Sequence, residues 1–374
     1  MKIAYMAGWP IPSRAANAVH VMKMCQAYAS SEHDVTLIYP QVDIDNLGEI
    51  SDVYSHYDVE NSFLMQPVKR LKGRIGLIIF AIIASYKAKK ANADIIHSRC
   101  LMSAWFACHT GIPVIFEKHD SLENQGKITK AIFKSLLKKK NFSKLVVISD
   151  ALKEHISASF EIESKDIISA HDGADPFPEH DIAPPFENNK ERIQVGYIGH
   201  LYPGRGIDII GEVAKHLTHT DFHLVGGTQE DISHWKNELS ELNNVYFHGY
   251  IPHKETIAYL KKVDILLAPY QKKVSGYKGE GNTVQWMSPL KIFEYMSTGI
   301  PMVCSDLSVL HEILTHKKNV FLCTPDKSNE WIDTIEYISG NYDEAKAIAL
   351  NAQKEFLETY TWKKRAEFIV KNLT

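Results

Sequence analysis

The sequence predicts an α/β protein built from two doubly wound domains joined by a hinge. Short strand-like runs alternate with helical segments of about 10 to 15 residues from the first residue onward. The alternation stops between residues 176 and 190, where four prolines and no periodicity indicate a linker. It then starts again. We expect an N-terminal domain over residues 1–185 and a C-terminal domain over residues 191–358.

The predicted strands are short and mostly apolar, which is typical of a parallel sheet covered on both faces. In the N-terminal domain they are Lys2–Met6, Asp34–Tyr39, Asp94–His97, Pro113–Glu117, Lys144–Ile148 and Ile167–Ala170. In the C-terminal domain they are Ile193–Ile198, Asp221–Val225, Val245–His248, Ile265–Pro269, Pro301–Cys304 and Asn319–Leu322. The polar segment 41–63 is predicted as a loop with at most one strand.

A helix is predicted to begin at Ser288 and to end at Gly299. Serine suits the N-cap and Pro289 the first helical position. Lys291 in the first turn opposes the helix dipole unless an anion binds there. Glu294 shares its face, so the amides and Lys291 could hold a pyrophosphate while Glu294 accepts from a ribose diol. A surface Glu–Lys helix pair explains the same spacing.

This stretch, Ser-Pro-Leu-Lys-Ile-Phe-Glu-Tyr-Met, resembles the second-domain signature of the retaining nucleotide-sugar glycosyltransferases of family 4. The resemblance implies a GT-B fold with an interdomain cleft and a C-terminal helix, about residues 359–374, that crosses back onto the first domain. It implies that the donor diphosphate and ribose are bound by Ser288, Pro289, Leu290, Lys291 and Glu294. The commoner family pattern has an earlier glutamate near the donor sugar, and Trp286 stands there in this chain.

A glycine-rich turn, Gly196 to Gly206, follows the first strand of the C-terminal domain. Its glycines let the backbone approach a ligand, and Arg205 can donate two hydrogen bonds to phosphate oxygens. Left-handed torsion angles alone explain such a turn equally well. The family resemblance implies donor contacts at Gly199, Arg205 and Gly206, and places His200 where the family has an arginine.

His119 lies at the carboxyl end of a predicted strand, where open α/β sheets place reactive groups. A lone histidine is more often structural. The resemblance implies that His119 contacts the donor sugar and the charge that develops on it, so we expect it to be the catalytic residue.

The acceptor is expected to contact the N-terminal domain. Arg14 and Asn17 stand in the loop after the first strand, where many family members have two glycines, and Arg99 follows another strand. A helix cap is an equal alternative for Asn17. The segment 271–285, with three glycines, is either a mobile lid over the donor or plain disorder.

The composition indicates a globular chain, with 45% hydrophobic and 23% charged residues among 374. Five cysteines without a Cys-x-x-Cys pair indicate reduced thiols, a cytoplasmic location and no zinc site. The N-terminus lacks the layout of a signal peptide. The longest apolar run, Leu77 to Ala84, is far shorter than the roughly 20 residues of a membrane span.

Positive charge is concentrated in one region. From Met65 to Leu145 there are 16 lysines and arginines against four acids. Residues 69–90 and 127–144 could bring the protein to an anionic membrane surface at the inner face of the cell membrane, or form solvated helix faces. Nucleic acid is not expected, because no recognition module accompanies the charge.

The sequence therefore predicts a retaining glycosyltransferase that moves a hexosyl-type sugar in the synthesis of cell-envelope polysaccharides such as lipopolysaccharide. The donor would be a UDP- or GDP-sugar and the acceptor a glycan or lipid-linked molecule, without cofactor or metal. The alternatives are a catalytically impaired sugar-nucleotide binding protein and a nucleotide-sugar epimerase. A nicotinamide dehydrogenase is disfavoured, since no Gly-x-Gly-x-x-Gly follows the first strand.

Overall fold

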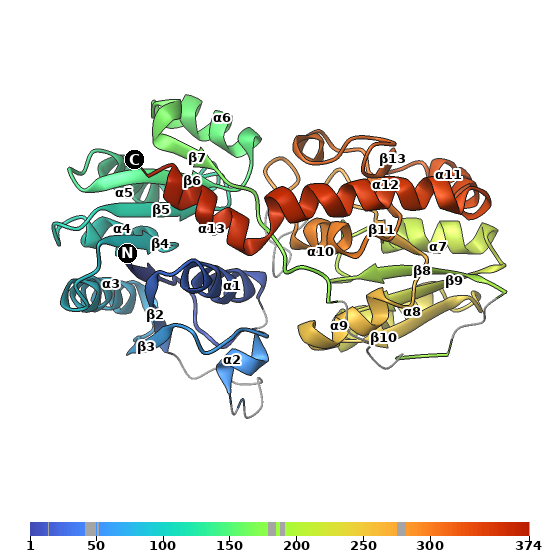
Figure 1. The fold of residues 1–374 in the computed structure, drawn as a ribbon, viewed down its shortest axis with the longest axis horizontal. Coiled ribbons are helices and arrows are strands. Elements are labelled where there is room, and N and C mark those ends of the chain that lie inside the picture. Colours follow the sequence, from blue (N-terminus) through green and yellow to red (C-terminus); the bar gives the residue numbers. More distant parts are fainter. Residues whose placement is uncertain are drawn as a thin grey trace. The chain divides into compact units, whose positions relative to one another are not determined.

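The computed structural model describes residues 1–13, 15–41, 50, 52–178, 185–187, 191–274 and 282–373. They form two compact units (Figure 1). Unit 1 contains Met1–Asp172 and Trp362–Thr374, and unit 2 contains Gly173–Thr361. The division falls directly after Asp172, ahead of the proline-rich segment, and the last helix returns to unit 1 as predicted.

Unit 1 is built on a seven-stranded parallel sheet with the order β3-β2-β1-β4-β5-β6-β7. The strands are β1 (Lys2–Met6), β2 (Asp34–Gln41), β3 (Leu64–Lys69), β4 (Ile95–Ser98), β5 (Val114–Lys118), β6 (Phe142–Val147) and β7 (Ile167–Ser169). The strand order reverses direction at β1, so the carboxyl ends of β1 and β4 form its switch point.

Two layers of helices cover this sheet. One contains α3 (Gly73–Lys90), α4 (Leu101–Ala107) and α5 (Lys127–Leu137), with α4 packed against both others. The other contains α1 (Ala16–Ser30), on which the C-terminal helix α13 (Trp362–Lys371) packs. The right-handed crossover rule places these two layers on opposite faces. The short helix α2 (Val53–His56) and α6 (Asp150–Phe160) complete the unit.

The sequence did not define β3. Its residues, Leu-Met-Gln-Pro-Val-Lys, are mixed polar and apolar; three of the six are exposed and only Val68 is buried. Pro67 lacks an amide hydrogen, which is tolerated because β3 is an edge strand paired only with β2. An edge strand therefore lacks the continuous apolar run by which the other strands were found.

Unit 2 has a six-stranded parallel sheet with the order β10-β9-β8-β11-β12-β13. The strands are β8 (Ile193–Ile198), β9 (Thr220–Val225), β10 (Val245–Gly249), β11 (Ile265–Ala268), β12 (Met302–Ser305) and β13 (Phe321–Cys323). All six were predicted to within two residues. Its switch point lies between β8 and β11.

The helices of unit 2 are α7 (Ile207–His216), α8 (Gln229–Glu238), α9 (His253–Leu260), α10 (Leu290–Thr298), α11 (Ser328–Gly340) and α12 (Tyr342–Glu355). A π-helical turn, Phe356–Tyr360, follows α12. Helix α7 packs on α11, and α10 packs on α12. The core includes Phe222, Ile265 and Trp331, each at most 1% exposed. The unit thus has the doubly wound layers that the sequence predicted.

All five cysteines are buried, and none is paired with another. Among the described residues, no helix combines the length and apolarity needed to cross a membrane.

Candidate active site

The first cluster of candidate residues lies at the switch point of the sheet in unit 2. Gly199 directly follows β8, and Tyr270 follows β11 by two residues. These strands are neighbours in the sheet, so their carboxyl ends open at the same edge. Ligands of open α/β sheets bind at this position.

Two glycines allow the backbone to pass close to other groups here. Gly206 has φ +80°, and a Cβ at this position would lie 1.9 Å from the carbonyl oxygen of Pro269. Gly199 has φ +155°, and its Cβ would lie 2.8 Å from Nζ of Lys291. A side chain at either position would therefore displace a neighbour. The glycines of this turn have a packing role in addition to their torsion angles.

Helix α10 begins at the same edge. Its N-cap is Pro289, one residue later than predicted for Ser288, and Leu290 is the first helical residue. Gly299 ends the helix in the left-handed conformation, as predicted. The amide of Ile292 donates to the carbonyl oxygen of Pro289. The first turn therefore holds Lys291 beside backbone amides that suit an anion.

Lys291 is a buried cation, only 8% exposed. Its Nζ lies 3.6 Å from the centre of the Tyr197 ring and 5.4 Å from that of Tyr270. Burial, and then the positive charge of Arg205, hold the pKa of Lys291 well below its usual value, while Glu294 opposes that shift. A bound anion would reverse this effect, because it favours the charged lysine.

Arg205 lies next to Lys291 and is held by aromatic side chains. Its guanidinium lies over the rings of Tyr202 and Tyr270, at 4.9 and 5.5 Å, and Nη2 donates to the hydroxyl of Tyr202 at 2.9 Å. Its Nε is buried and makes no hydrogen bond within the described part of the chain. An arginine with an unused buried donor is suited to bind an oxyanion.

His200 and Glu294 complete this cluster. Partial loss of hydration, followed by the charges of Arg205 and Lys291, lowers the pKa of His200 to about 4. The ring is therefore neutral at pH 7, and it stacks on Tyr202 with 4.9 Å between ring centres. Glu294 is half-buried one turn into α10. The structure thus brings together Gly199, His200, Arg205, Gly206, Lys291 and Glu294.

The segment 271–285 is described only at its two ends. The amide of Val274 donates to Asn282 Oδ1 at 3.0 Å, and the amide of Thr283 donates to the carbonyl oxygen of Val274 at 3.0 Å. These contacts hold the ends of the segment together. Residues 275–281, on which the predicted lid depends, lie outside the described residues. Trp286 is half-buried in the turn before α10.

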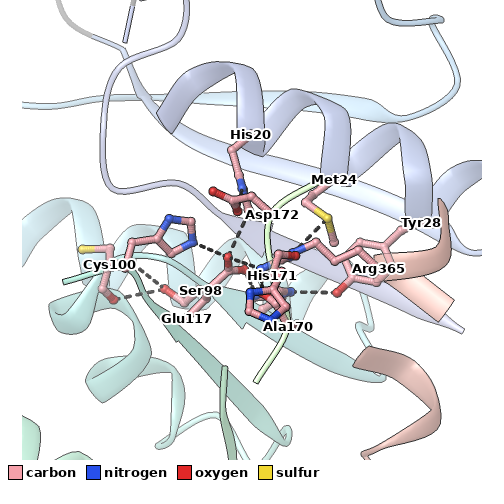
Figure 2. A network of polar contacts seen from close by, with 12 residues as sticks. His20, Met24, Tyr28, Ser98, Cys100, Glu117, Ala170, His171, Asp172 and Arg365 are labelled. Atoms are coloured by element: carbon pink, nitrogen blue, oxygen red, sulfur yellow. Dashed lines mark hydrogen bonds and ion pairs between the residues drawn. The ribbon is translucent and has the colours of Figure 1, made fainter. Parts of the chain in front are cut away.

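The second cluster lies in unit 1 and centres on Glu117 of β5, whose side chain is fully buried (Figure 2). Its Oε1 accepts hydrogen bonds from Arg365 Nη2 at 2.9 Å and from His119 Nε2 at 2.5 Å. His20 and His97 also contact this carboxylate, at 3.0 and 2.7 Å. Burial alone would raise the pKa of Glu117, but Arg365, then His20 and the bond from His119, hold it well below its usual range.

His20 bridges two buried carboxylates. Its Nε2 lies 3.0 Å from Glu117 and its Nδ1 lies 2.9 Å from Asp172 Oδ1. The ring of His20 therefore lies between the two acids. Arg365, a fixed cation, compensates the buried carboxylate of Glu117. That compensation is what a low-dielectric interior requires.

Arg365 ties the C-terminal helix α13 to this cluster, as Figure 2 shows. Besides Glu117 it donates to the carbonyl oxygens of His171, at 2.8 Å, and Ala170, at 3.1 Å. Its Nη1 contacts the sulfur of Met24 on α1 at 3.3 Å. A segment near the end of the chain therefore completes the charge balance beneath the predicted catalytic loop.

His119 lies at the carboxyl end of β5 with its side chain 21% exposed. Burial and then the charge of Arg99 lower its pKa to about 3, so the ring is neutral at pH 7. Nε2 donates to Glu117, which leaves Nδ1 as an acceptor. Burial, and to a lesser extent the charge of Arg99, also lowers the pKa of Lys118 to about 8. Arg99 directly follows β4.

The other predicted acceptor residues differ in their placement. Arg99 has a buried Nη1 that makes no hydrogen bond with the described residues. Asn17 lies within the first turn of α1, and the N-cap is Ala15. The alternative that Asn17 caps the helix is therefore wrong. Arg14 lies outside the described residues.

Four members of the unit 1 cluster, His20, Glu117, His119 and Asp172, offer ligand atoms within 4.8 Å of one another, a spacing that could hold a metal ion. The contacts argue for a different role. Glu117 already accepts from Arg365 and from His119, and Asp172 Oδ1 already lies 2.9 Å from His20 Nδ1. A divalent cation would add charge beside a buried guanidinium. We interpret this group as an ion-pair network that supports His119.

Sequence reasoning missed His20, Glu117 and Arg365 as members of a site. His20 and Arg365 lie inside helices, where no local motif distinguishes them from other helical residues. Arg365 is separated from Glu117 by 248 positions. The one available signal was Glu117 itself, a carboxylate at the end of an apolar strand two residues before His119.

Two parallel doubly wound sheets, each with basic side chains at its carboxyl edge, and a last helix that returns to the first sheet are the architecture of a GT-B glycosyltransferase. Comparison with known families agrees. The model described as Glycosyltransferase Family 4 matches residues 18–177, and that described as Glycosyl transferases group 1 matches residues 192–341. The chain is therefore a glycosyltransferase with the GT-B fold.

Individual relatives are distant. TuaH of Bacillus subtilis, named as a teichuronic acid biosynthesis glycosyltransferase, is 34% identical over 120 residues, 32% of this chain and 28% of TuaH. The uncharacterized glycosyltransferase MJ1607 of Methanocaldococcus jannaschii is 21% identical over 97% of this chain and 95% of its own. The structure of Anabaena Alr3699/HepE in complex with UDP has a TM-score of 0.74 at 15% identity, covering 100% of this chain and 99% of HepE.

Proposed function

We propose that the protein transfers a hexosyl-type sugar from a UDP- or GDP-sugar, with retention of the anomeric configuration, to a glycan or lipid-linked acceptor of the cell envelope. The observation that carries this proposal is the pair of cations at the switch point in unit 2, the buried Lys291 and the half-buried Arg205 with its buried Nε. Lys291 has a strongly lowered pKa, and Arg205 has an unused donor. A diphosphate would satisfy both groups.

The leaving group is the first chemical problem. As the bond from the sugar to the diphosphate breaks, negative charge grows on the phosphate oxygens. This charge would be stabilised by Arg205, Lys291 and the backbone amides of Ser288 and Leu290. Pro289 has no amide hydrogen and would only position its neighbours. Two fixed cations can take the place of a divalent metal, so we propose that the reaction needs none. Glu294, one turn further along α10, would accept hydrogen bonds from the ribose.

The sugar is the second problem, because it develops positive charge as the leaving group departs. A neutral His119 has an acceptor nitrogen for a sugar hydroxyl and adds no positive charge. Glu117 fixes its orientation through the bond from Nε2. We therefore propose His119 as the residue of unit 1 that contacts the donor sugar.

The acceptor is the third element. Arg99 and Lys118 place two basic groups next to His119, and Arg99 has an unused buried donor. We propose that the acceptor carries an anionic group, a phosphate or a carboxylate, near the hydroxyl that is glycosylated. The partial match to TuaH, whose name places it in teichuronic acid biosynthesis, supports an envelope polysaccharide. HepE was crystallised with UDP, which supports testing UDP-sugars first.

The test is turnover of a panel of UDP- and GDP-sugars in EDTA, with neutral and phosphorylated sugar acceptors. Release of nucleoside diphosphate that depends on the acceptor, with product of unchanged anomeric configuration by NMR, would support the proposal. Inverted product would overturn retention. Binding of a donor without turnover under any condition would favour a catalytically impaired binding protein. Trp286 and His200, which replace a glutamate and an arginine of the family pattern, are the reason for considering this alternative.

A further inference from the structure

Helix α3 of unit 1 exposes an apolar stripe along its outer face. The exposed side chains recur at spacings of three and four residues, which places them on one face of the helix. They are Ile75, Ile78, Ile79, Ile82, Ile83 and Tyr86, with exposed fractions from 36% for Ile83 to 73% for Ile75. We call these six residues the isoleucine ridge.

The inner face of α3 is also apolar. Phe80, Ala81, Ala84 and Ala88 are fully buried in unit 1. A surface helix of a globular protein ordinarily has polar residues on the face opposite its buried stripe. In α3 that face carries the isoleucine ridge, so the helix is apolar on both sides. A contiguous exposed patch of this kind marks a surface that is covered by a partner.

Positive charge surrounds the ridge. The segment from Leu64 to Ala93 contains seven lysines and arginines and no acid. Four of them, Lys69, Arg70, Lys72 and Arg74, precede or begin α3, and Lys87, Lys89 and Lys90 end it. The ridge is therefore an apolar strip with a cationic group at each end.

The second basic helix belongs to the same layer. Helix α4 packs against both α3 and α5, and these helices lie side by side in unit 1 (Figure 1). Helix α5 exposes Lys127, Lys134 and Ile128, the last at 68%. Its exposed residues are Lys127, Ile128, Ala131 and Lys134, so lysines make up half of its exposed face, in contrast to the isoleucine ridge of α3. The structure thus separates the two basic segments of the sequence into an apolar ridge and a cationic flank.

We infer that this face docks on an anionic lipid bilayer, with the isoleucine ridge of α3 inserted at the boundary between headgroups and acyl chains. Branched aliphatic side chains gain free energy in that environment, and Tyr86 has the amphipathic ring that suits an interface. The lysines and arginines at both ends would meet anionic headgroups. The positive charge at both ends of α3 favours an anionic lipid surface over a second copy of this chain, because two copies of this face would bring like-charged helix ends together.

The inference does not rest on the donor chemistry. Every residue it uses lies in α3, its flanks or α5, and none belongs to the clusters around Lys291 or Glu117. Failure to bind lipid would leave nucleotide binding untouched, and failure to bind nucleotide would leave lipid binding untouched. Docking at this face would bring unit 1 to a lipid-linked acceptor. The proposed reaction would then take place at the membrane surface.

The experiment is flotation of the full-length protein with vesicles at 100 mM NaCl. One set of vesicles is pure phosphatidylcholine, and the other contains 30% phosphatidylglycerol. The inference predicts binding to the second set and at least tenfold weaker binding to the first. In 500 mM NaCl the binding should weaken, because the electrostatic contribution is screened.

Two pairs of substitutions separate the ridge from the charge. Ile79→Ser with Ile82→Ser should weaken vesicle binding at least tenfold, with Leu350→Ser and Leu357→Ser, exposed in unit 2, as the matched control. Lys89→Gln with Lys90→Gln should weaken it about 30-fold, at about fivefold per lost charge. Lys363→Gln with Lys364→Gln, exposed on α13, is the control for charge.

All of these positions are exposed, so circular dichroism should show folded variants. Equal binding of wild type and Ile79→Ser/Ile82→Ser would overturn the role of the ridge. Equal binding to both kinds of vesicle would overturn recognition of anionic lipid. A wild-type dimer in light scattering that Ile79→Ser/Ile82→Ser converts to a monomer, without vesicle binding, would show that a second copy covers the face.

Discussion

Replacing Arg365 with methionine tests whether the C-terminal helix completes the charge balance of unit 1. The side chain is 2% exposed and Glu117 is fully buried, so the variant leaves a carboxylate without its guanidinium partner. Breaking a buried ion pair by removing one partner costs about 3–5 kcal/mol. His20, His97 and His119 still contact Glu117, so we expect the lower end, about 3 kcal/mol in the free energy of unfolding of unit 1.

The assay must read the two units separately, because a chain with two units need not unfold in one step. Hydrogen–deuterium exchange in a urea series can follow a peptide covering β5 in unit 1 and one covering β11 in unit 2. We expect Arg365→Met to lower the midpoint of the β5 peptide and to leave that of the β11 peptide unchanged. Lys364→Met, an exposed neighbour on α13, is the control and should change neither.

A double variant identifies the cause. In Arg365→Met/Glu117→Gln the buried negative charge is removed together with its partner. We expect the loss to be smaller than the sum of the two single losses by about 1–3 kcal/mol. Strictly additive losses, or a loss in Arg365→Met no larger than in Lys364→Met, would refute the charge-balance argument.

Three further predictions concern pH and the two clusters. Because the pKa of Glu117 is lowered in the folded state, its contribution to stability is complete above its unfolded pKa of about 4.3 and is lost as the pH falls through the folded value. Between pH 7 and 3 the free energy of unfolding should therefore fall more steeply in wild type than in Glu117→Gln, and parallel curves would contradict this prediction. Lys291→Ala should lower kcat about 10²- to 10³-fold and affect donor binding less, whereas Glu294→Ala should mainly weaken donor binding. Unchanged donor kinetics in both variants would contradict the assignment of Lys291 and Glu294 to the donor site. Gly199→Ala, whose Cβ would meet the end of Lys291, should weaken nucleotide binding, and because φ +155° strains a residue with a side chain it should also lower thermal stability; unaltered affinity would show that the position of Lys291 does not matter.

The fold could be predicted from the sequence because the strands of a parallel sheet are buried on both faces and form continuous apolar runs. Ile193–Ile198 and Lys2–Met6 were predicted at their observed bounds. The edge strand Leu64–Lys69 escaped, since only one of its residues, Val68, is buried. Each miss therefore marks a place where burial, and with it the apolar pattern, is incomplete.

The donor cluster could be predicted for a similar reason. Arg205 and Lys291 belong to short motifs in which glycine, proline and a cation occur together, and the topology of an open sheet then brings the ends of β8 and β11 together. The network around Glu117 has no such local signal. His20, Glu117 and Arg365 come from three distant segments, and only the folded chain shows that they balance one another.

The most direct test of the central claim is calorimetric binding of UDP and GDP in EDTA to wild type, Arg205→Ala and Arg192→Ala. Arg192 forms an ion pair with Asp221 in the same unit and is the control for loss of an arginine. We predict that wild type and Arg192→Ala bind one nucleotide without metal and that Arg205→Ala binds it about 10- to 100-fold more weakly, since a charged hydrogen bond contributes about 1.5–3 kcal/mol. Equal affinity in all three proteins, or no binding by wild type, would contradict the assignment of this cluster as the diphosphate site.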